Sequence, residues 1–344
     1  MNRRILWPVL LLMIVLAPWS GPARAQAAGM AITVELGDVS ATKLPFIVAA
    51  ESGIYARNGL DVTQFITPGA AEAIRQTGII VPPEFIRGGI VGDINIGGGS
   101  PTIVRMTTNA LAPQRIILAT NTTTASFHVF ARNGITTLAG LKGKRVGYGN
   151  AGALDHLIFL AVMKKIGLDP VHDISMLSNI SGPDVAAKTD VDAFISDGFK
   201  SSEAVKVGFR DIADLSRYNI PILGSGVNAM KSWLPSHRAA AAAFIKSTVE
   251  AIALVKKDKN AAFAAMTKWY GISDPALLEP IYDQATHLSS KPYPSVAGLN
   301  VVRSIYTWRE MAIHPPSYFI DPSFVTELDR SGYIDGLYSS VDRK

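Results

Sequence analysis

Hydrophobic and polar positions follow two different periods along the chain from about residue 30 onward. Short apolar runs rich in β-forming residues predict strands, at residues 32–37, 61–66, 93–96, 113–121, 144–150, 173–177 and 191–196. Amphipathic stretches with helical spacing lie between them, at residues 44–60 and 154–168. One face of the second stretch collects apolar residues: Leu154, Leu157, Ile158, Ala161, Val162 and Ile166. Strands that alternate with helices predict an α/β fold with mainly parallel sheets.

The pattern changes after residue 235. The segment 236–272 is rich in alanine, favours helix and shows no strand period, so it predicts a packed helical hairpin. From Tyr293 onward, repeated prolines predict a tail that wraps over the surface in short pieces. With 344 residues, the chain is too long for one ordinary core, which indicates two domains.

The first 25 residues form a pattern of their own. Two arginines precede an apolar run that ends at Ala17, and Ala-Arg-Ala at 23–25 fits the cleavage site of a secretory signal. A membrane anchor is the alternative, but Pro8 interrupts the run, which is shorter than the roughly 20 residues that a span needs. We therefore expect a signal peptide, residues 1–25, cleaved after Ala25, and export of the rest to the periplasm.

Charge and cysteine content narrow the classes of function. Residues 1–25 hold three of the 33 basic residues and none of the 28 acidic ones, so without them the net charge falls from +5 to +2. No basic cluster with interleaved aromatics occurs either, which argues against a nucleic-acid partner. The chain has no cysteine, so we expect no disulfide, no thiol chemistry and no lipid anchor of the bacterial type.

Motifs of catalysis are sparse. The six histidines show no metal-ligand spacing, and the chain contains neither a G-x-S-x-G elbow nor a phosphate-binding Walker motif. We therefore expect no catalytic residue, no metal and no cofactor. A binding protein fits this pattern better than an enzyme.

The stretch "GDINIGGGSPTIVRM" places three consecutive glycines, residues 97–99, between a strand and a predicted helix. Pro101 suits the first helical position, and Ser100 suits the N-cap. Free backbone N–H groups and the positive end of the helix dipole would then face an anionic or polar ligand. This makes Gly98, Gly99 and Ser100 candidate ligand-binding residues, and a tight turn packed against a neighbouring lobe is the alternative.

"GYGNAG", residues 147–152, also follows a strand and opens a helix. Its G-x-G-x-x-G spacing matches the dinucleotide fingerprint, but the next predicted strand, 173–177, ends without an acidic residue that would hold a ribose. We therefore interpret the loop as a second ligand-binding elbow, in which Asn150, Ala151 and Gly152 offer backbone donors and one amide side chain.

Two more loops supply candidates. In "GDVSATKLPF", Lys43 would balance an anion and Phe46 would stack on a ring, and a solvated lysine is the alternative. Thr123, in the segment 121–127, would offer a hydroxyl to the ligand, unless this segment is only an extended hinge.

The end of the strand at 191–196 supplies the last candidates. Asp197 and Phe199 would face a ligand there, and an exposed turn is the alternative. Asp197 would oppose a pure anion, so in a site it favours a ligand with a donor or a positive group. The segment "ILGSGVNAM" is the predicted return crossing between lobes and places Ser225 and Asn228 near the hinge.

Three segments together resemble the substrate-binding proteins of ABC importers, in the family called NMT1/THI5-like or SsuA/TauA-like. They are "LPFIVAAESGIYARNGLDVT", the glycine stretch "GDINIGGGSPTIVRM", and "LAGLKGKRVGYGNAGALDHLIFLAVMKKIGLDP". The resemblance extends from about Ile32 to Tyr338. It implies a type II periplasmic binding protein fold with two α/β lobes, two crossover strands and a ligand cleft between the lobes. Lobe I would comprise 30–122 and 224–344, and lobe II would comprise 123–223.

The resemblance implies a periplasmic monomer that captures a small organic molecule or oxyanion and delivers it to an ABC importer permease. Sulfonates, taurine, nitrate and pyrimidine precursors are the family's ligand types, and an aromatic or carboxylate-bearing ligand stays open. A ligand-sensing subunit is the alternative, and a pyrimidine-synthase-like enzyme is a more distant one because the cysteine motif of those enzymes is missing. Asp190 stands where a glycine often precedes V-D-A, and the second elbow reads Asn-Ala-Gly-Ala, so sulfonate is a family default and not a deduction.

Overall fold

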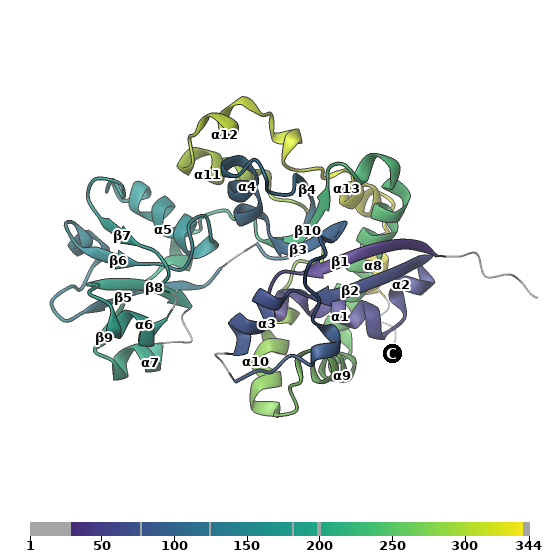
Figure 1. Ribbon diagram of the computed structural model, residues 1–344, viewed down its shortest axis with the longest axis horizontal. Coiled ribbons are helices and arrows are strands. Elements are labelled where there is room, and N and C mark those ends of the chain that lie inside the picture. The colour runs from purple at the N-terminus through teal and green to yellow at the C-terminus, as the bar shows by residue number, and fades with distance from the viewer. Residues whose placement is uncertain (1–28, 76–77, 124, 181, 198–200, 340–344) are drawn as a thin grey trace, which may run out of the picture.

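Two five-stranded sheets organise the chain (Figure 1). The computed structural model describes residues 29–75, 78–123, 125–180, 182–197 and 201–339, so the predicted signal peptide and Phe199 lie outside the described residues. Sheet A has the strand order β2 (Leu60–Ile66), β1 (Met30–Leu36), β3 (Ile94–Gly98), β10 (Ser225–Met230) and β4 (Arg115–Thr120). Sheet B has the order β7 (Ser175–Leu177), β6 (Arg145–Gly147), β8 (Ala193–Asp197), β5 (Phe127–Arg132) and β9 (Phe209–Asp214).

Each sheet has one strand that runs against its neighbours. In sheet A, β10 is antiparallel to β3 and β4, whereas β1 is parallel to β2 and β3. In sheet B, β5 is antiparallel to β8 and β9, whereas β6 is parallel to β7 and β8. The predicted α/β fold with two lobes is thus confirmed. We call sheet A with its helices lobe I, and sheet B with its helices lobe II.

Helices flank both sheets. Those that alternate with the strands are α1 (Leu44–Glu51), α2 (Ile54–Arg57), α3 (Pro68–Arg75), α4 (Gly99–Thr108), α5 (Leu154–Lys165), α6 (Pro183–Lys188) and α7 (Ser201–Lys206). The C-terminal helices are α8 (Arg238–Lys257), α9 (Lys259–Tyr270), α10 (Pro275–Thr286), α11 (Val296–Ile305), α12 (Arg309–Ile313), α13 (Ser323–Arg330) and α14 (Tyr333–Tyr338). Among the described residues, every helix is too short or too polar to cross a membrane.

Local sequence rules account for some of the helix boundaries. The predicted helix at 44–60 divides into α1 and α2 because Gly53 adopts a left-handed conformation, with φ of 66°. The predicted alanine-rich hairpin is confirmed as α8 and α9. Asp258 separates the two helices, and its side chain caps α9 by accepting a 2.9 Å hydrogen bond from the Ala261 N–H.

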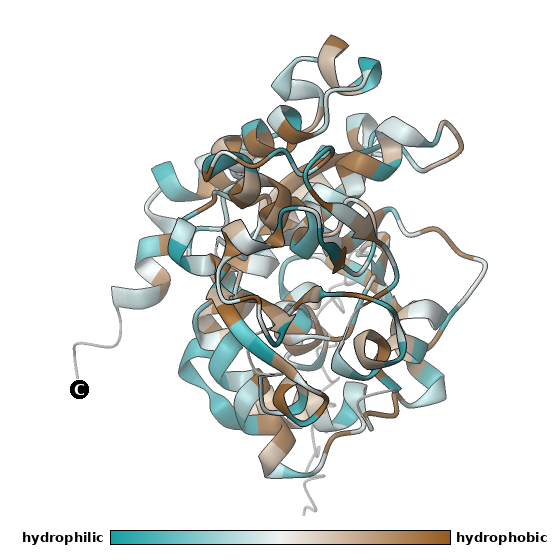
Figure 2. Cartoon of the chain, turned by 90° about the vertical axis from the view of Figure 1, so that its left-hand side faces the viewer, coloured by the Kyte–Doolittle hydropathy of each residue, from teal (hydrophilic) through white to brown (hydrophobic). Residues whose placement is uncertain are grey.

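Apolar packing holds each lobe together. In lobe I, α1 and α8 bury aromatic rings against each other, with Phe46 stacked on Phe244 at 6.0 Å between ring centroids. In lobe II, Phe130 and Phe194 stack at 5.2 Å in a separate cluster. Figure 2 shows apolar and hydrophilic residues interleaved along the helices, as expected of helices that bury one face.

The sequence pattern missed three strands, β5, β9 and β10. The clearest case is β10, which lies in the segment predicted as the return crossing. Small residues make it compatible with a central position, since a Cβ on Gly226 would lie 1.9 Å from the Ala119 carbonyl oxygen of β4. Pairing on both sides with β3 and β4 therefore overrides a weak local propensity.

Candidate functional site

Both connections between the sheets join the same two edges. The carboxyl ends of β1, β3 and β4 lie at one edge of sheet A, together with the first residue of the antiparallel β10. Residues 121–126 lead from the end of β4 to the start of β5, and residues 215–224 lead from the end of β9 to the start of β10. Ligands of open α/β sheets bind at carboxyl ends of strands, so these facing edges are the candidate site.

A polar network lies at the lobe I edge. We call it the Lys43 cluster, and it consists of Asp38, Ser40, Thr42, Lys43 and Ser225. The Lys43 Nζ donates to Asp38 Oδ2, to Thr42 Oγ1 at 3.0 Å and to Ser225 Oγ at 2.8 Å. The Ser40 hydroxyl donates to Asp38 Oδ1 at 2.6 Å. These hydrogen bonds therefore connect the loop after β1 to Ser225, the first residue of β10.

The position of Lys43 differs from both expectations for it. Its side chain is 1% exposed, so it is not a solvated lysine, and its three donors are all engaged by the protein, so none is left for an anion. A buried ammonium requires a partner, and Asp38 supplies it. Asp38 itself is 50% exposed, so the part of this ion pair that faces outward is the carboxylate.

Tyr270 supports the cluster from the helical side. Its hydroxyl donates to the Ser40 carbonyl at 3.2 Å. Burial, together with the charge of Asp38, raises the pKa of Tyr270, so the phenol stays protonated and remains a donor. Helix α9 is thereby tied to the loop that carries Asp38.

Asn121 joins the first crossing to the same cluster. Its Nδ2 donates to the Thr42 carbonyl at 2.7 Å, and its backbone N–H donates to the Ser225 carbonyl at 2.8 Å. Its Oδ1 is buried, and no partner for it occurs among the described residues. Thr123 was the residue predicted in this segment, and Asn121 was not, although a polar residue directly after an apolar strand was the available signal.

The glycine elbow, residues 97–99, packs against the return crossing. The N–H of Gly99 donates to the Gly224 carbonyl at 2.8 Å, and the N–H of Ser100 donates to the Leu223 carbonyl at 3.1 Å. A Cβ on Gly99 would lie 2.8 Å from the Leu223 side chain and 3.1 Å from its carbonyl oxygen. The first donors of α4 are thus used inside the protein, which favours the packed-turn alternative.

The predicted N-cap role of Ser100 is wrong. The N-cap of α4 is Gly98, and the buried Ser100 hydroxyl donates to the Leu223 carbonyl at 3.1 Å instead. Gly98 is half-buried, and a Cβ there would meet the Pro101 ring at 3.0 Å. The glycines therefore serve the close approach of two chain segments.

The second elbow, residues 147–152, contains both exposed and buried positions. Asn150 and Ala151 are exposed, whereas Gly152 is buried with φ of 79°. A Cβ on Gly152 would lie 2.6 Å from Val104 of α4, so this loop contacts lobe I. Asp155 stabilises the loop by accepting a 2.8 Å hydrogen bond from the Gly149 N–H. Burial raises the pKa of Asp155.

His156 connects lobe II to the C-terminal helices. Its ring stacks on Tyr148 at 4.2 Å between centroids, and its Nδ1 lies 3.0 Å from the Tyr306 hydroxyl. Burial lowers the pKa of His156 to about 4, so the ring is neutral at pH 7. Its Nδ1 then accepts hydrogen bonds from the Tyr306 hydroxyl and the Gly152 N–H, which stabilises the contact between the lobes.

The remaining predicted residues are dispersed. Phe46 is 1% exposed in the core of lobe I, so its ring has no free face for a ligand here. Thr123 is exposed and borders a hollow of about 170 Å³ beside the crossings. Asp197 ends β8 opposite Phe127, at the lobe II edge. The structure therefore brings Lys43 to one edge, and Asn150 and Asp197 to the other.

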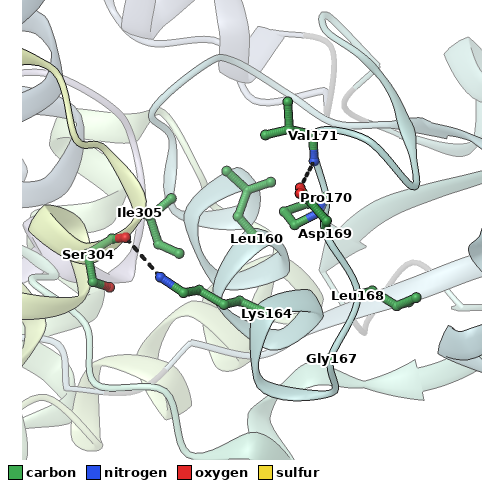
Figure 3. Close-up of a pocket in the computed structure, with 9 residues that line it drawn as sticks. All are labelled: Leu160, Lys164, Gly167, Leu168, Asp169, Pro170, Val171, Ser304 and Ile305. Atoms are coloured by element: carbon green, nitrogen blue, oxygen red, sulfur yellow. Dashed lines mark hydrogen bonds between the residues drawn. The ribbon is translucent and has the colours of Figure 1, made fainter.

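A larger hollow of about 420 Å³ lies away from this site (Figure 3). It is lined by Leu160 and Lys164 of α5, by the loop 167–171 that follows this helix, and by Ser304 and Ile305. Lys164 Nζ donates to the Ser304 carbonyl at 3.2 Å. The 12-residue α5 begins at the second elbow and is about 18 Å long, so the hollow is at the opposite end of the helix. Among the described residues, no group of three or more acidic or histidine side chains is placed to hold a metal.

Residues 92–262 match the model of a family described as NMT1/THI5 like. This segment contains the glycine elbow, both crossings, all of lobe II's sheet and helix α8. No curated protein sequence matches the chain.

Solved structures with the same fold include proteins with different activities. The aliphatic sulphonate binding protein SsuA from Escherichia coli is 17% identical, with a TM-score of 0.56 over 80% of this chain and 90% of that one. The nitrate-binding protein NrtA from Synechocystis PCC 6803 is 14% identical, with a TM-score of 0.57 over 92% and 90%. The desulfurization enzyme DSZB is 16% identical, with a TM-score of 0.52 over 87% and 99%. At these identities the comparison establishes the type II periplasmic binding protein fold.

Proposed function

Since the chain belongs, through residues 92–262, to the NMT1/THI5-like family, we propose that it is a periplasmic solute-binding protein. It captures a small organic molecule or oxyanion between its two lobes and delivers it to the permease of an ABC importer. Residues 30–122 and 224–344 form one lobe, and residues 123–223 form the other. Export would use residues 1–25 as a cleaved signal, and the protein would act as a monomer without a lipid anchor.

One observation carries this proposal: both crossings join the edges of the two sheets at which ligands of such folds bind. A solute that touches both edges has more contacts when the lobes are close together. Its affinity for the closed form is then higher than for the open form, and this difference drives closure. The closed molecule presents a different surface to the permease than the open one does.

An enzyme is the second candidate, because the fold also occurs in a desulfurization enzyme. The side chains at the two edges favour binding instead. The chain contains no cysteine, Lys43 has its donors engaged, and His156 is bonded to Tyr306 away from the exposed part of the second elbow. A sensing subunit would use the same closure and differ only in its membrane partner.

The test is a search for bound solute in purified protein. Mass spectrometry of the small molecules released by unfolding identifies any co-purified compound, and thermal shift of the refolded protein measures binding. A compound at 100 times its Kd adds about 2.7 kcal/mol to stability. We expect at least one compound to raise the Tm by several degrees without being converted. Turnover of that compound would favour the enzyme, and absence of any released or stabilising compound would overturn the proposal.

A further inference from the structure

We propose that residues 294–318 form an arm of lobe I that bonds to lobe II and opposes closure of the two lobes. The arm contains α11 and α12. The inference rests on the proposed closure around a solute and adds an element that controls it. The two ends of the arm are attached to lobe I, whereas its middle is attached to lobe II.

Both ends of the arm are attached to β4, an edge strand of sheet A. Before the arm, the Thr120 N–H donates to the Pro292 carbonyl at 2.9 Å. The Thr120 hydroxyl also donates to the Tyr293 carbonyl at 2.8 Å. After the arm, the Ile117 N–H donates to the Phe319 carbonyl at 2.9 Å. The arm therefore leaves lobe I and returns to it at the same strand.

The middle of the arm is bonded to α5 of lobe II at two points. Near the start of α5, His156 Nδ1 lies 3.0 Å from the Tyr306 hydroxyl. Near the end of α5, Lys164 Nζ donates to the Ser304 carbonyl at 3.2 Å. We call these two hydrogen bonds the latch. Because His156 and Lys164 are about two turns apart, the latch fixes both the position and the direction of α5 relative to α11.

Movement of α5 against the arm breaks the latch more readily than it disturbs the apolar packing beside it. A hydrogen bond requires a short distance and an aligned donor, whereas packed apolar helices can slide by small amounts and stay in contact. A hollow of about 420 Å³ borders the bond between Lys164 and Ser304 (Figure 3). This end of the arm therefore has space for such a movement.

The latch is formed in an arrangement of the lobes that leaves the facing edges unconnected. Among the described residues, no hydrogen bond or ion pair joins the Lys43 cluster to the exposed Asn150 of the second elbow. Figure 1 shows α11 and α12 on one side of the crossings and α3 and α7 on the other. A rotation about the crossings that brings α3 toward α7 therefore draws α5 away from the arm. Closure then costs the two bonds of the latch, so the latch favours the more open form.

The rate of cross-linking between the lobes measures closure without any solute. The chain has no cysteine, so a short bismaleimide selects cysteines introduced at two exposed positions, Glu72→Cys on α3 and Glu203→Cys on α7. In protein refolded to remove bound compounds, cross-links form in proportion to the closed population. We expect the latch variant, Lys164→Met with Tyr306→Phe, to cross-link about tenfold faster than the parent, because each lost hydrogen bond changes the equilibrium severalfold.

Lys188→Met, at an exposed site at the end of α6, is the matched control and should cross-link at the rate of the parent. A monofunctional maleimide compares thiol reactivity among the variants, and the Tm shows whether each one folds. If the latch variant is unstable, Lys164→Met alone should still cross-link about threefold faster. Equal rates would show that the latch survives closure, which overturns the inference and leaves solute binding intact. Failure to find any solute would reject the proposed function, while the comparison of rates would still decide whether the arm opposes closure.

Discussion

Lys43 and Asp38 illustrate how a buried charge is made tolerable at one residue position. The ammonium is surrounded by a carboxylate and two hydroxyls, so its desolvation is offset by hydrogen bonds. Lys43 was predictable as a candidate because it is a charge in a loop after an apolar strand. Its contact with Ser225 was not predictable, because Ser225 is 182 positions away and reaches Lys43 through the pairing of β10 in sheet A.

His156 gives a prediction for the dependence of stability on pH. Its folded-state pKa of about 4 lies below the ordinary value of 6.5, so as the pH falls the unfolded chain takes up the proton first. The contribution of His156 to stability is therefore present above pH 6.5 and is lost between pH 6.5 and pH 4.

The prediction is checked by urea unfolding of His156→Gln at pH 7.5 and pH 4.5. We expect the variant to be less stable than the parent at pH 7.5, because the bonds to Tyr306 and Gly152 are disturbed. We also expect the difference to shrink at pH 4.5. His237→Gln, at an exposed site, is the control, and a difference that stays constant with pH would contradict the assignment.

The elements of both lobes were largely predictable from hydrophobic period, whereas the contacts between elements were not. The strands at 61–66 and 173–177 and the helix at 154–168 were found within a few residues of their observed bounds. The three glycines at 97–99 were recognised as unusual. The sequence did not show why glycine is needed there, which is that residues 223–224 pack closely against Gly99. A local pattern does not specify which distant segment takes up the donors of a helix.

Gly152 offers a prediction at the scale of elements. It combines φ of 79° with close contact to Val104 of α4, so a methyl group there meets both backbone strain and a clash. Gly167, at the end of α5, has φ of 82° and nothing within 4 Å of an added Cβ. We expect Gly152→Ala to destabilise the protein by about 1–3 kcal/mol more than Gly167→Ala. Equal Tm values for the two variants would show that α4 and the second elbow are not packed as described.

The two lobes share apolar packing at one side of the molecule. Val104 of α4, Leu157 of α5 and Leu299 of α11 belong to one buried cluster, which therefore includes residues from lobe I, lobe II and the C-terminal helices. In Figure 1, α11 and α12 lie beside α4 above the crossings. We infer that this packing and the two crossings act as the pivot, and that the facing sheet edges move relative to each other.

Small-angle X-ray scattering with and without a stabilising solute tests the central claim most directly. The compound is the one that gives the largest thermal shift, used at a concentration that saturates the protein, and a compound that gives no thermal shift is the control. Closure of two lobes on a solute predicts a smaller radius of gyration with the binding compound and no change with the control. An unchanged radius at demonstrated saturation would contradict capture by closure between the lobes.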